Sequence, residues 1–478
     1  MEQAPDTGSG PDERVVTAQL RRHLPTRAGR RFREWFLMRL RGTLRTVDRV
    51  PLASLRGWDF DAADLNLRHE SGRFFTVEGL HVRGAPGAVP EWSQPIINQA
   101  EIGVLGLLVR KREHGVECLV QAKMEPGNPN VLQISPTVQA TRSNFTRVHR
   151  GKPTKYLDHF AHARGVLADV LQSEQGAWFL SKRNRNMIVL VDEEIPPAED
   201  FHWIPLRELR ALLHVDGMVN MDLRTVLACM PATVDHWDTA ARTRGSELPA
   251  QEHPAGCHDN VADVLSWFTG LKSRCTMTVR SAPLLGLPEW TRGPDEIAHV
   301  EGRHFSIIGV SVRAGNREVA EWDQPLLRPV GRDVIAFLVS SSEHGRFDVL
   351  VRARTQVGLV DGVEMGPTVH WGPSHRSDDE PEVLDWVLRA PKERVLFDTV
   401  LAEEGGRFHH ALNRYMIVDT RSDIPRHVPD DHRWVSLLQL EALVRHGYYL
   451  NIEARTLLAC LHSVAGPRTR TPGQGAGQ

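Results

Sequence analysis

The sequence predicts a mixed α/β protein built from two tandem copies of one domain. Two observations carry this prediction: a repeat that spans most of the 478 residues, and in each copy a strand–turn–strand pattern followed by a closing pair of helices. A chain of this length is expected to hold two or three domains. Hydrophobic residues make up 41% and charged residues 25% of the chain, which is typical of globular proteins rather than fibrous or disordered ones.

The repeat consists of motifs that recur in the same order. The segment EWSQP at 91–95 matches EWDQP at 321–325, and the triplet EHG at 113–115 matches EHG at 343–345. Further along, both copies contain an Asn-Arg-x-Met-Ile-Val run. Two units of this length are expected to fold as complete globular domains, because a solenoid is built from many short units.

The repeat also sets the expected domain boundaries. We expect an N-terminal tail over 1–29, the first copy over 30–231, a polar linker over 232–261, the second copy over 262–464 and a disordered tail over 465–478.

The same elements are expected in each copy, in the same order. An amphipathic helix opens the first copy near 29–46. The expected strands cover 74–83 and 305–313, the hairpins 102–123 and 334–354, and the short buried strands 187–191 and 416–418. The other expected helices cover 155–173 and 391–402, with closing pairs at 205–214 and 220–230 and at 436–445 and 451–461. This order predicts mixed sheets with antiparallel hairpins, covered by helices.

Charge and cysteine usage exclude several classes of protein. The net charge of −2 argues against a protein that coats nucleic acid. The five cysteines contain no CxxC pair, which predicts neither a disulfide framework nor a zinc site and indicates a reducing cytoplasm. No apolar run reaches the 18 residues that crossing a membrane requires.

The segment from Gln121 to Met187 is the most unusual part of the sequence. It contains no P-loop, GxSxG, HExxH or Rossmann motif. Lys123 and Glu125 are two residues apart and share one face if the strand continues. Nearby Trp and Arg side chains would suit a nucleotide diphosphate. The alternative is a solvated loop with a polar helix cap.

Comparison of the two copies identifies residues that occur in one copy only, which are candidates for catalysis, and residues that occur in both. In the second copy Lys123 is replaced by Arg354, Glu125 by Gln356, Gln139 by His370 and Trp178 by Arg407. The acid–base pair is kept in the first copy, so we expect the catalytic pocket there. Shared residues serve the fold or a common ancestral ligand, and they include Trp92, Gln94, Thr137, Asn184 and Arg185.

Three motifs in this segment resemble those of the NDP-hexose 2,3-dehydratases, enzymes of deoxysugar pathways for bacterial natural products. They are QAKMEPGN at 121–128, SPTVQATRSN at 135–144 and SEQGAWFLSKRNRNM at 173–187. The resemblance covers nearly the whole chain. It implies two tandem Nudix hydrolase-like domains, one with the working pocket and one with a relic pocket, in a homodimer.

The resemblance also bears on metal binding. When the last Gly of the Nudix motif is aligned with Gly176 or Gly405, each copy keeps one motif carboxylate, Glu174 or Glu403. One carboxylate is too few to hold catalytic Mg²⁺. We therefore expect neither a metal nor another cofactor.

The implied reaction is the elimination of water from a dTDP-4-keto-6-deoxyhexose. A base removes the C3 proton, an enolate forms on O4, and the C2 hydroxyl leaves. The resulting 3,4-diketo-2,6-dideoxyhexose would be consumed by a 3-ketoreductase. Two alternatives are a Nudix-type sugar-nucleotide hydrolase and a non-catalytic sugar-nucleotide binding protein.

The candidate catalytic residues are Glu125, Lys123 and Tyr156. Glu125 or Tyr156 would act as base or acid, and Lys123 would polarise the carbonyl. We expect the sugar to be bound by Thr137, Gln139, Ser143 and Asn144, the diphosphate by Arg147, Arg183 and Arg185, and the thymine or sugar ring by Trp92 or Trp178. The remaining candidates for substrate binding are Gln94, Asn184 and Asn186.

Overall fold

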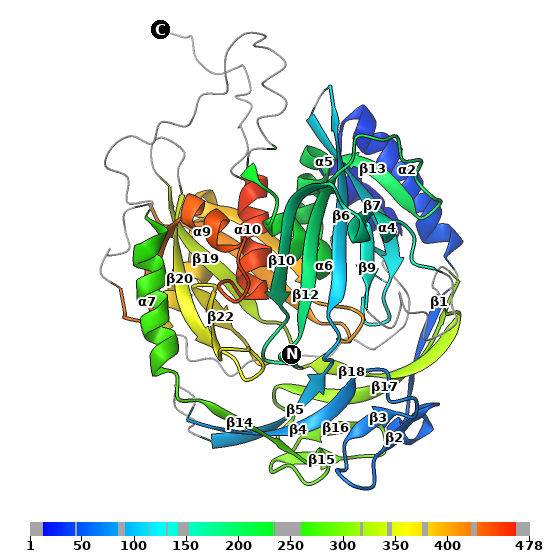
Figure 1. Ribbon diagram of the computed structural model, residues 1–478, viewed down its shortest axis with the longest axis vertical. Helices are drawn as coiled ribbons and strands as arrows, with labels where there is room; N and C mark the ends of the chain where they lie inside the picture. The colour runs from blue at the N-terminus through cyan, green and yellow to red at the C-terminus, as the bar shows by residue number, and fades with distance from the viewer. Residues whose placement is uncertain are drawn as a thin grey trace.

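The computed structural model describes residues 13–43, 45–84, 91–113, 115–130, 132–141, 153–232, 234, 260–315, 319–341, 347–374, 381–421 and 428–464. Most of the expected linker at 232–261 and the whole expected tail at 465–478 lie outside these residues. Figure 1 shows the two larger sheets side by side, with helices α6 and α10 between them, and two smaller sheets below.

Each copy contributes one seven-stranded mixed sheet. In the first copy the strands are β10 (Gly165–Ser173), β12 (Arg183–Leu190), β6 (Gly103–Arg112), β7 (Gly115–Met124) and β13 (Phe201–Pro205), with β8 (Leu132–Ser135) beside β7 and β9 (Val138–Ala140) beside β6. The second copy repeats this order with β23 (Val395–Ala402), β24 (Leu412–Asp419), β19 (Val334–Ser341), β20 (Phe347–Thr355), β25 (His432–Ser436), β21 (Val363–Gly366) and β22 (Val369–Trp371). The pairs β12–β6 and β24–β19 are parallel.

The two smaller sheets exchange strands between the copies. One contains β11 (Phe179–Leu180), β5 (Glu91–Asn98), β4 (Thr76–Arg83), β3 (Leu67–His69) and β2 (Trp58–Phe60), and β14 (Thr278–Ala282) of the second copy pairs with β4. The other contains β17 (Phe305–Ala314), β16 (Glu296–His299), β15 (Trp290–Arg292) and β18 (Glu321–Pro329), and β1 (Arg45–Val50) of the first copy pairs with β17. The expected tandem copies are therefore present, but they are interlocked.

Helices cover the large sheets and fill the space between them. They are α1 (Glu13–His23), α2 (Arg27–Gly42), α4 (Asp158–Ala161), α5 (Leu206–Ala211), α6 (Met221–Ala228), α7 (Val261–Arg274), α8 (Pro381–Leu388), α9 (Leu437–Leu443) and α10 (Ile452–Val464), with short 3-10 turns at Leu52–Ser54, Leu212–His214 and Lys392–Arg394. None of the helices in the described ranges has the length and apolar character needed to cross a membrane.

The predicted hairpins, opening helix and closing helices are confirmed, but three expectations need correction. The stretch 1–29, expected as a tail, contains α1, whose Val16 and Leu20 are buried in the main core. The helices expected at 155–173 and 391–402 are mainly the strands β10 and β23. Each of these strands pairs with a neighbour through a register shift near its start. Such a bulge breaks the period of two that marks a strand, and tertiary pairing overrides the helix-like spacing.

Two fully buried arginines connect the copies at the centre of the molecule. Arg224 on α6 donates to Ala402 O at the end of β23 (2.7 Å). Arg455 on α10 contacts Ser173 O at the end of β10 and donates to Thr225 Oγ1 (2.7 Å). Each helix is thus hydrogen-bonded to the last residue of a strand in the other copy. Burying a guanidinium is costly unless its N–H groups and charge are matched. The carbonyl groups accept from the N–H groups, and buried glutamates, Glu364 near Arg455 and Glu403 near Arg224, oppose the charges.

In a second reciprocal contact, the loop after β23 is bonded to the loop after β7, and the loop after β10 to the loop after β20. Gly127 N donates to Gly405 O, and Gly358 N donates to Gly176 O, both at 2.7 Å. A Cβ atom on Gly127 would lie 1.7 Å from Phe408 O, and the contact at Gly358 is equally close. Only glycine allows the two backbones to approach this closely.

Replacing Gly127 with alanine should therefore destabilise the whole chain. We expect Gly127→Ala to lower the free energy of unfolding by about 1–3 kcal/mol, because two backbones must separate to admit the methyl group. Urea unfolding followed by circular dichroism measures this change. Gly42→Ala is the control, since nothing lies within 4 Å of the added carbon. Equal stabilities of the two variants would refute the close-approach argument.

Glu364 makes the contact between the copies sensitive to pH. Its carboxylate accepts a hydrogen bond from Ser173 Oγ (2.6 Å), and burial raises the pKa of Glu364 to about 7 against the opposing charge of Arg455. The unfolded value is about 4.3. Between these values the folded state holds a proton that the unfolded state has released, so stability falls as pH rises through this window.

We expect Glu364→Gln to remove this pH dependence. From pH 5 to pH 7.5 the wild type should lose about 1–3 kcal/mol of stability relative to the variant. Urea unfolding of both proteins at several pH values gives the comparison. Parallel stability curves would show that Glu364 does not change its protonation on unfolding in this window.

Candidate active site

A cavity of about 550 Å³ lies beside the large sheet of the first copy and is lined by residues of both copies. The first copy contributes residues of β6, β7, β9 and α6, the loop after β10, and the aromatic end of the sheet that contains β2 and β3. The second copy contributes Glu321, Trp322, Asp323 and Gln324 of β18 and Glu404, Gly406 and Arg407 of the loop after β23.

The cavity opens where the hairpin β6–β7 forks. The two strands pair as far as Leu108 and Leu119, and β9 then replaces β7 beside β6. Thr137 lies at the fork, where its Oγ1 accepts from Leu108 N (2.9 Å) and donates to Leu119 O. The second copy repeats this contact with Thr368. Thr137 therefore holds the fork open and does not line the cavity.

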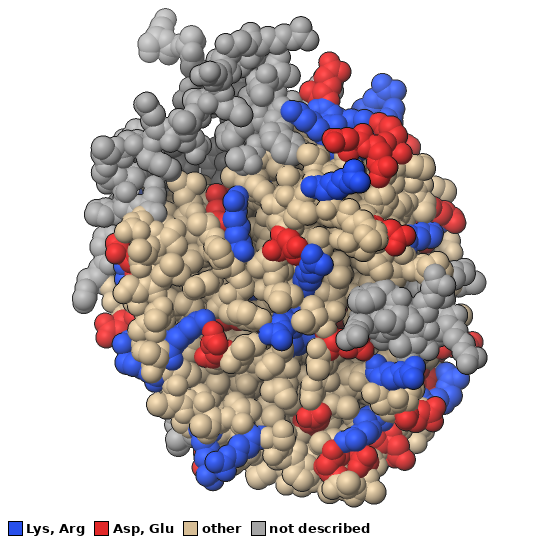
Figure 2. All heavy atoms as spheres, in the orientation of Figure 1, with Lys and Arg blue, Asp and Glu red and all other residues tan. Residues whose placement is uncertain are grey.

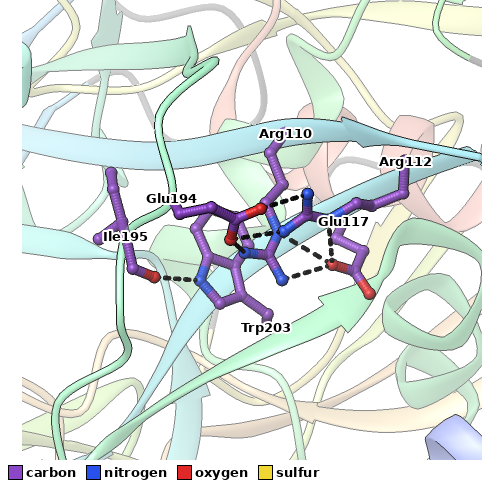
Figure 3. Close-up of polar contacts among 6 residues, drawn as sticks. All are labelled: Arg110, Arg112, Glu117, Glu194, Ile195 and Trp203. Carbon is purple, nitrogen blue, oxygen red and sulfur yellow. Dashed lines mark hydrogen bonds and ion pairs between the residues drawn. The ribbon is translucent and has the colours of Figure 1, made fainter.

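At its closed end the same hairpin is held by the ion pairs drawn in Figure 3. Arg110 contacts Glu117 (2.8 Å) and Glu194 (3.0 Å), and Arg112 also contacts Glu194. The Arg110 guanidinium lies 4.1 Å from the centre of the Trp203 ring. These contacts fix the hairpin that carries the side chains at the fork.

Beyond the fork, a hydrogen-bonded group connects β7, β9 and α6. Lys123 Nζ donates to Gln139 O (3.1 Å), and Gln139 Nε2 donates to Glu125 Oε1 (2.6 Å). Asn128 Nδ2 donates to Glu125 Oε2 (3.1 Å), and Asn220 Nδ2 donates to Gln139 Oε1 (3.2 Å). The Glu125 carboxylate is buried and accepts a hydrogen bond on each oxygen. The two-residue spacing thus brings Lys123 and Glu125 to one site, with Gln139 between them.

Besides Glu125, the cavity is lined by the carboxyl groups of Glu70, Glu174, Asp222, Glu321, Asp323 and Glu404, and three of these have raised pKa values. Burial raises the pKa of Asp222 well above its usual range, and the charges of Glu174 and Glu125 add to this effect. Burial also raises the pKa of Glu174, and that of Glu404 to about 8. Among the described residues, Oε2 of Glu174 and Oε2 of Glu404 have no hydrogen-bond partner. Carboxyl groups that stay protonated near neutral pH can donate hydrogen bonds and protons.

A second lysine also lines the cavity. Lys182 Nζ contacts Glu101 O, and burial lowers the pKa of Lys182 to about 8. Sequence reasoning missed Lys182, Asp222 and Glu404 as site residues. A signal for two of them was present, because Lys182 is matched by Ala411 and Glu404 by Gln175 in the other copy.

The outer part of the cavity is cationic and aromatic. Arg407 lies 4.2 Å from the centre of the Phe75 ring and donates to Gln99 Oε1 (3.1 Å). Arg56 is ion-paired with Asp323 (2.8 Å). Trp58, Phe74, Phe179 and Trp322 also contribute aromatic rings to the cavity lining.

Four of the predicted site residues line the cavity: Lys123, Glu125, Gln139 and Asn184. Asn184 Nδ2 donates to Glu174 Oε1 (2.6 Å), and Asn186 is buried behind it with Nδ2 donating to Asn184 O (3.2 Å). Ser143, Asn144 and Arg147 lie outside the described residues.

Trp92 and Gln94 do not line this cavity, whereas their second-copy counterparts Trp322 and Gln324 do. Trp92 donates to Gln94 Oε1 (2.9 Å) and packs against the cluster that contains Val357 of the second copy. The small sheets connect the copies, so β5 lies next to the second copy and β18 next to the first. Trp92 and Gln94, which were expected in the first pocket, therefore lie outside the lining of this cavity.

The remaining predicted residues have partners away from the cavity lining. Trp178 is buried in the core with its ring edge-on to Phe408, 4.6 Å between ring centres. Arg183 donates to the Tyr448 hydroxyl (2.9 Å), and Arg185 forms a surface pair with Asp169 (2.7 Å). The second copy repeats that surface pair with Arg414 and Asp398.

Tyr156 is also engaged elsewhere. Its hydroxyl accepts from Ala198 N (2.7 Å) and donates to Pro196 O (3.1 Å), and its ring lies edge-on to Phe201. These contacts give Tyr156 a role in holding the chain near residue 196.

The matching fork of the second copy is filled by its own side chains. Arg354 donates to Thr368 O (2.9 Å) and to Pro367 O (3.1 Å). Gln356 accepts from Gly176 N (3.1 Å), and His370 lies 3.3 Å from the Asp333 carboxylate. The Lys–Glu pair of the first copy is thus replaced by Arg354 and Gln356, which bind backbone groups.

The carboxyl groups of the site are not arranged as a metal centre. Among the described residues, no three His, Cys, Asp or Glu side chains are grouped so that they could hold a metal ion. Glu174 and Glu403 follow strands and not helices, so the alignment that placed them in a Nudix-type helix is wrong.

Comparison with known proteins identifies the family. The family model of the NDP-hexose 2,3-dehydratases matches the chain twice, over 29–230 and 261–461. A dTDP-4-dehydro-6-deoxy-alpha-D-glucopyranose 2,3-dehydratase of Streptomyces violaceoruber is 48% identical over 91% of this chain and 97% of its own length. Enzymes of the same name from Saccharopolyspora spinosa and Amycolatopsis orientalis are 46% and 42% identical over 91% of this chain, covering 91% and 90% of their own lengths. The chain therefore belongs to the NDP-hexose 2,3-dehydratase family.

Proposed function

We propose that the cavity binds a dTDP-4-keto-6-deoxyhexose and eliminates its C2 hydroxyl to give a dTDP-3,4-diketo-2,6-dideoxyhexose. The observation that carries this proposal is the joining of Lys123 and Glu125 through Gln139 inside one buried cavity. The reaction needs a base and a cation at neighbouring atoms of one sugar. The relatives named for this substrate are similar over most of the chain.

Glu125 is the proposed base for the C3 proton. The C4 carbonyl makes this proton acidic, and removing it places negative charge on O4. Lys123 is the proposed donor to O4, because a buried ammonium group stabilises such a charge more than water does. Gln139 holds both groups and is a positioning residue.

Collapse of the enolate then breaks the C2–O bond. The C4 carbonyl re-forms, a double bond forms between C2 and C3, and the hydroxyl leaves as water after it takes up a proton. The 3-hydroxy enone tautomerises to the 3,4-diketone. No step changes the overall oxidation state of the sugar, so the reaction requires no redox cofactor.

The two ends of the cavity suit the two ends of a sugar nucleotide. Arg407 and the aromatic side chains would hold the diphosphate and thymine, since guanidinium groups bind phosphate and aromatic rings stack on bases. The carboxyl-rich end would hold the hexose, with Gln139 and Asn184 as hydrogen-bond partners. Roles for Ser143, Asn144 and Arg147 in binding stay predictions.

Four wider features belong to the same proposal. We infer a homodimer, a cytoplasmic location, a 3-ketoreductase that consumes the diketone, and a Nudix-like relation for each large sheet. Figure 2 shows acidic and basic side chains interspersed on the face it displays.

Incubation with dTDP-4-keto-6-deoxyglucose tests the reaction. We expect loss of one water, with the diketone trapped as a stable alcohol when a 3-ketoreductase and its reduced nicotinamide are added. Mass spectrometry of the nucleotide sugar reads out the product. Cleavage of the diphosphate would instead indicate a hydrolase, and unchanged substrate would contradict the proposal.

Two variants test the assigned roles. We expect Glu125→Gln to abolish both turnover and exchange of the C3 proton in deuterated buffer, because the amide cannot accept a proton. Lys123→Met should slow both by 10²-fold or more, on the order lost with one oxyanion donor. Gln356→Glu is the matched control in the second copy: it keeps an oxygen for Gly176 N and should turn over like the wild type. Full exchange in the Glu125 variant would exclude it as the base.

A further inference from the structure

The loop 403–408 of the second copy differs from its first-copy counterpart, 174–179, at residues that line the cavity. Glu404 stands where the first copy has Gln175, Gly406 where it has Ala177, and Arg407 where it has Trp178. All three second-copy residues line the cavity that contains Lys123 and Glu125.

The glycine at 406 makes room for the Glu404 side chain. A Cβ atom on Gly406 would lie 2.4 Å from Glu404 Oε1, so alanine would collide with the carboxylate. In the first copy, Ala177 is compatible with Gln175, whose Nε2 donates to Glu403 Oε2 (2.9 Å). The change to Glu and the change to Gly are therefore parts of one arrangement.

The loop is anchored against the proposed base. Gly127 N, two residues after Glu125, donates to Gly405 O (2.7 Å). On its other side, Gln324 Nε2 donates to Gly406 O (2.7 Å). Glu404 thus has a fixed position relative to the chain that carries Glu125.

The surroundings of Glu404 suit a proton donor. Its Oε2 is shielded from solvent and has no hydrogen-bond partner among the described residues. Burial, with the charges of Glu125 and Glu174, raises the pKa of Glu404 to about 8 against the opposing charge of Arg407. This environment favours the protonated form of Glu404.

The two other cavity carboxyl groups whose pKa values are raised, those of Glu174 and Asp222, do not distinguish the two copies. Glu174 is matched by Glu403, and Asp222 by Glu453. Both copies keep an acid at these positions, including the copy whose fork is filled. Of the three carboxyl groups with raised pKa values, only Glu404 is replaced by a neutral residue, Gln175, in the other copy.

We propose that Glu404, supplied by the second copy, is the catalytic residue that protonates the departing C2 hydroxyl in the pocket of the first copy. This inference rests on the proposed dehydration. When the enolate collapses, the C2–O electron pair leaves with the oxygen, and the Glu404 proton converts that oxygen to water. Glu404 is left as a carboxylate, and the proton that Glu125 took from C3 restores it, so the protons balance over the turnover.

Glu404→Gln should separate the two halves of the reaction. We expect elimination to fall by 10²-fold or more, the usual contribution of a general acid, while the recovered substrate still gains deuterium at C3. The residual turnover should no longer decline as pH rises through about 8. Mass spectrometry and proton NMR of the recovered nucleotide sugar measure both quantities, and a melting curve confirms that the variant is folded.

Gly406→Ala provides a second route to the same result, since it displaces the carboxylate without removing it. We expect the same separation of exchange from elimination, whereas the matched Ala177→Gly should retain wild-type turnover. Wild-type elimination by Glu404→Gln, or loss of exchange together with elimination, would overturn the assignment. Failure of the base assignment is distinguishable, because it appears as retained exchange in Glu125→Gln.

Discussion

The structure depends on the reciprocal burial of Arg224 and Arg455. Each guanidinium is fully buried and is hydrogen-bonded to the terminal carbonyl group of a strand in the other copy. Removing one partner of such a contact would leave a charge or a carbonyl group uncompensated in the core. The two large sheets are therefore fixed at the strand ends from which the loops 174–179 and 403–408 emerge. Exchange of β1 and β14 extends the same interlocking to the small sheets.

Because the two copies interlock, residues of both line one cavity, and this cavity contains several lysine and carboxyl groups. The loop 403–408 of the second copy lies against the fork of the first copy, and the loop 174–179 lies against the fork of the second. A substitution in either copy can therefore alter a pocket that both copies line. Lys123, Glu125 and Lys182 come from the first copy, and Glu404 and Arg407 from the second. The residues at the opposite positions, such as Arg354 and Gln356, bind backbone groups instead. The second copy is thus a structural and chemical part of the site.

The sequence was sufficient to predict the duplication, the hairpins and the closing helices, because these have strong local patterns. It did not reveal β10 and β23, whose bulges break the strand period. At the site, Lys123 and Glu125 were predictable from their spacing and from their loss in the second copy. Trp92 and Trp178 were also expected in the pocket but do not line the cavity. Comparison of the copies cannot show which copy completes which pocket. That information lies in long-range contacts such as Gly127 with Gly405.

The most direct test of this composite pocket is a crystal structure with bound dTDP or a stable dTDP-hexose. We expect the diphosphate beside Arg407, with the sugar directed toward Glu125 and Glu404. A nucleotide bound beside Trp92 and Trp178 and absent from the cavity would contradict the account.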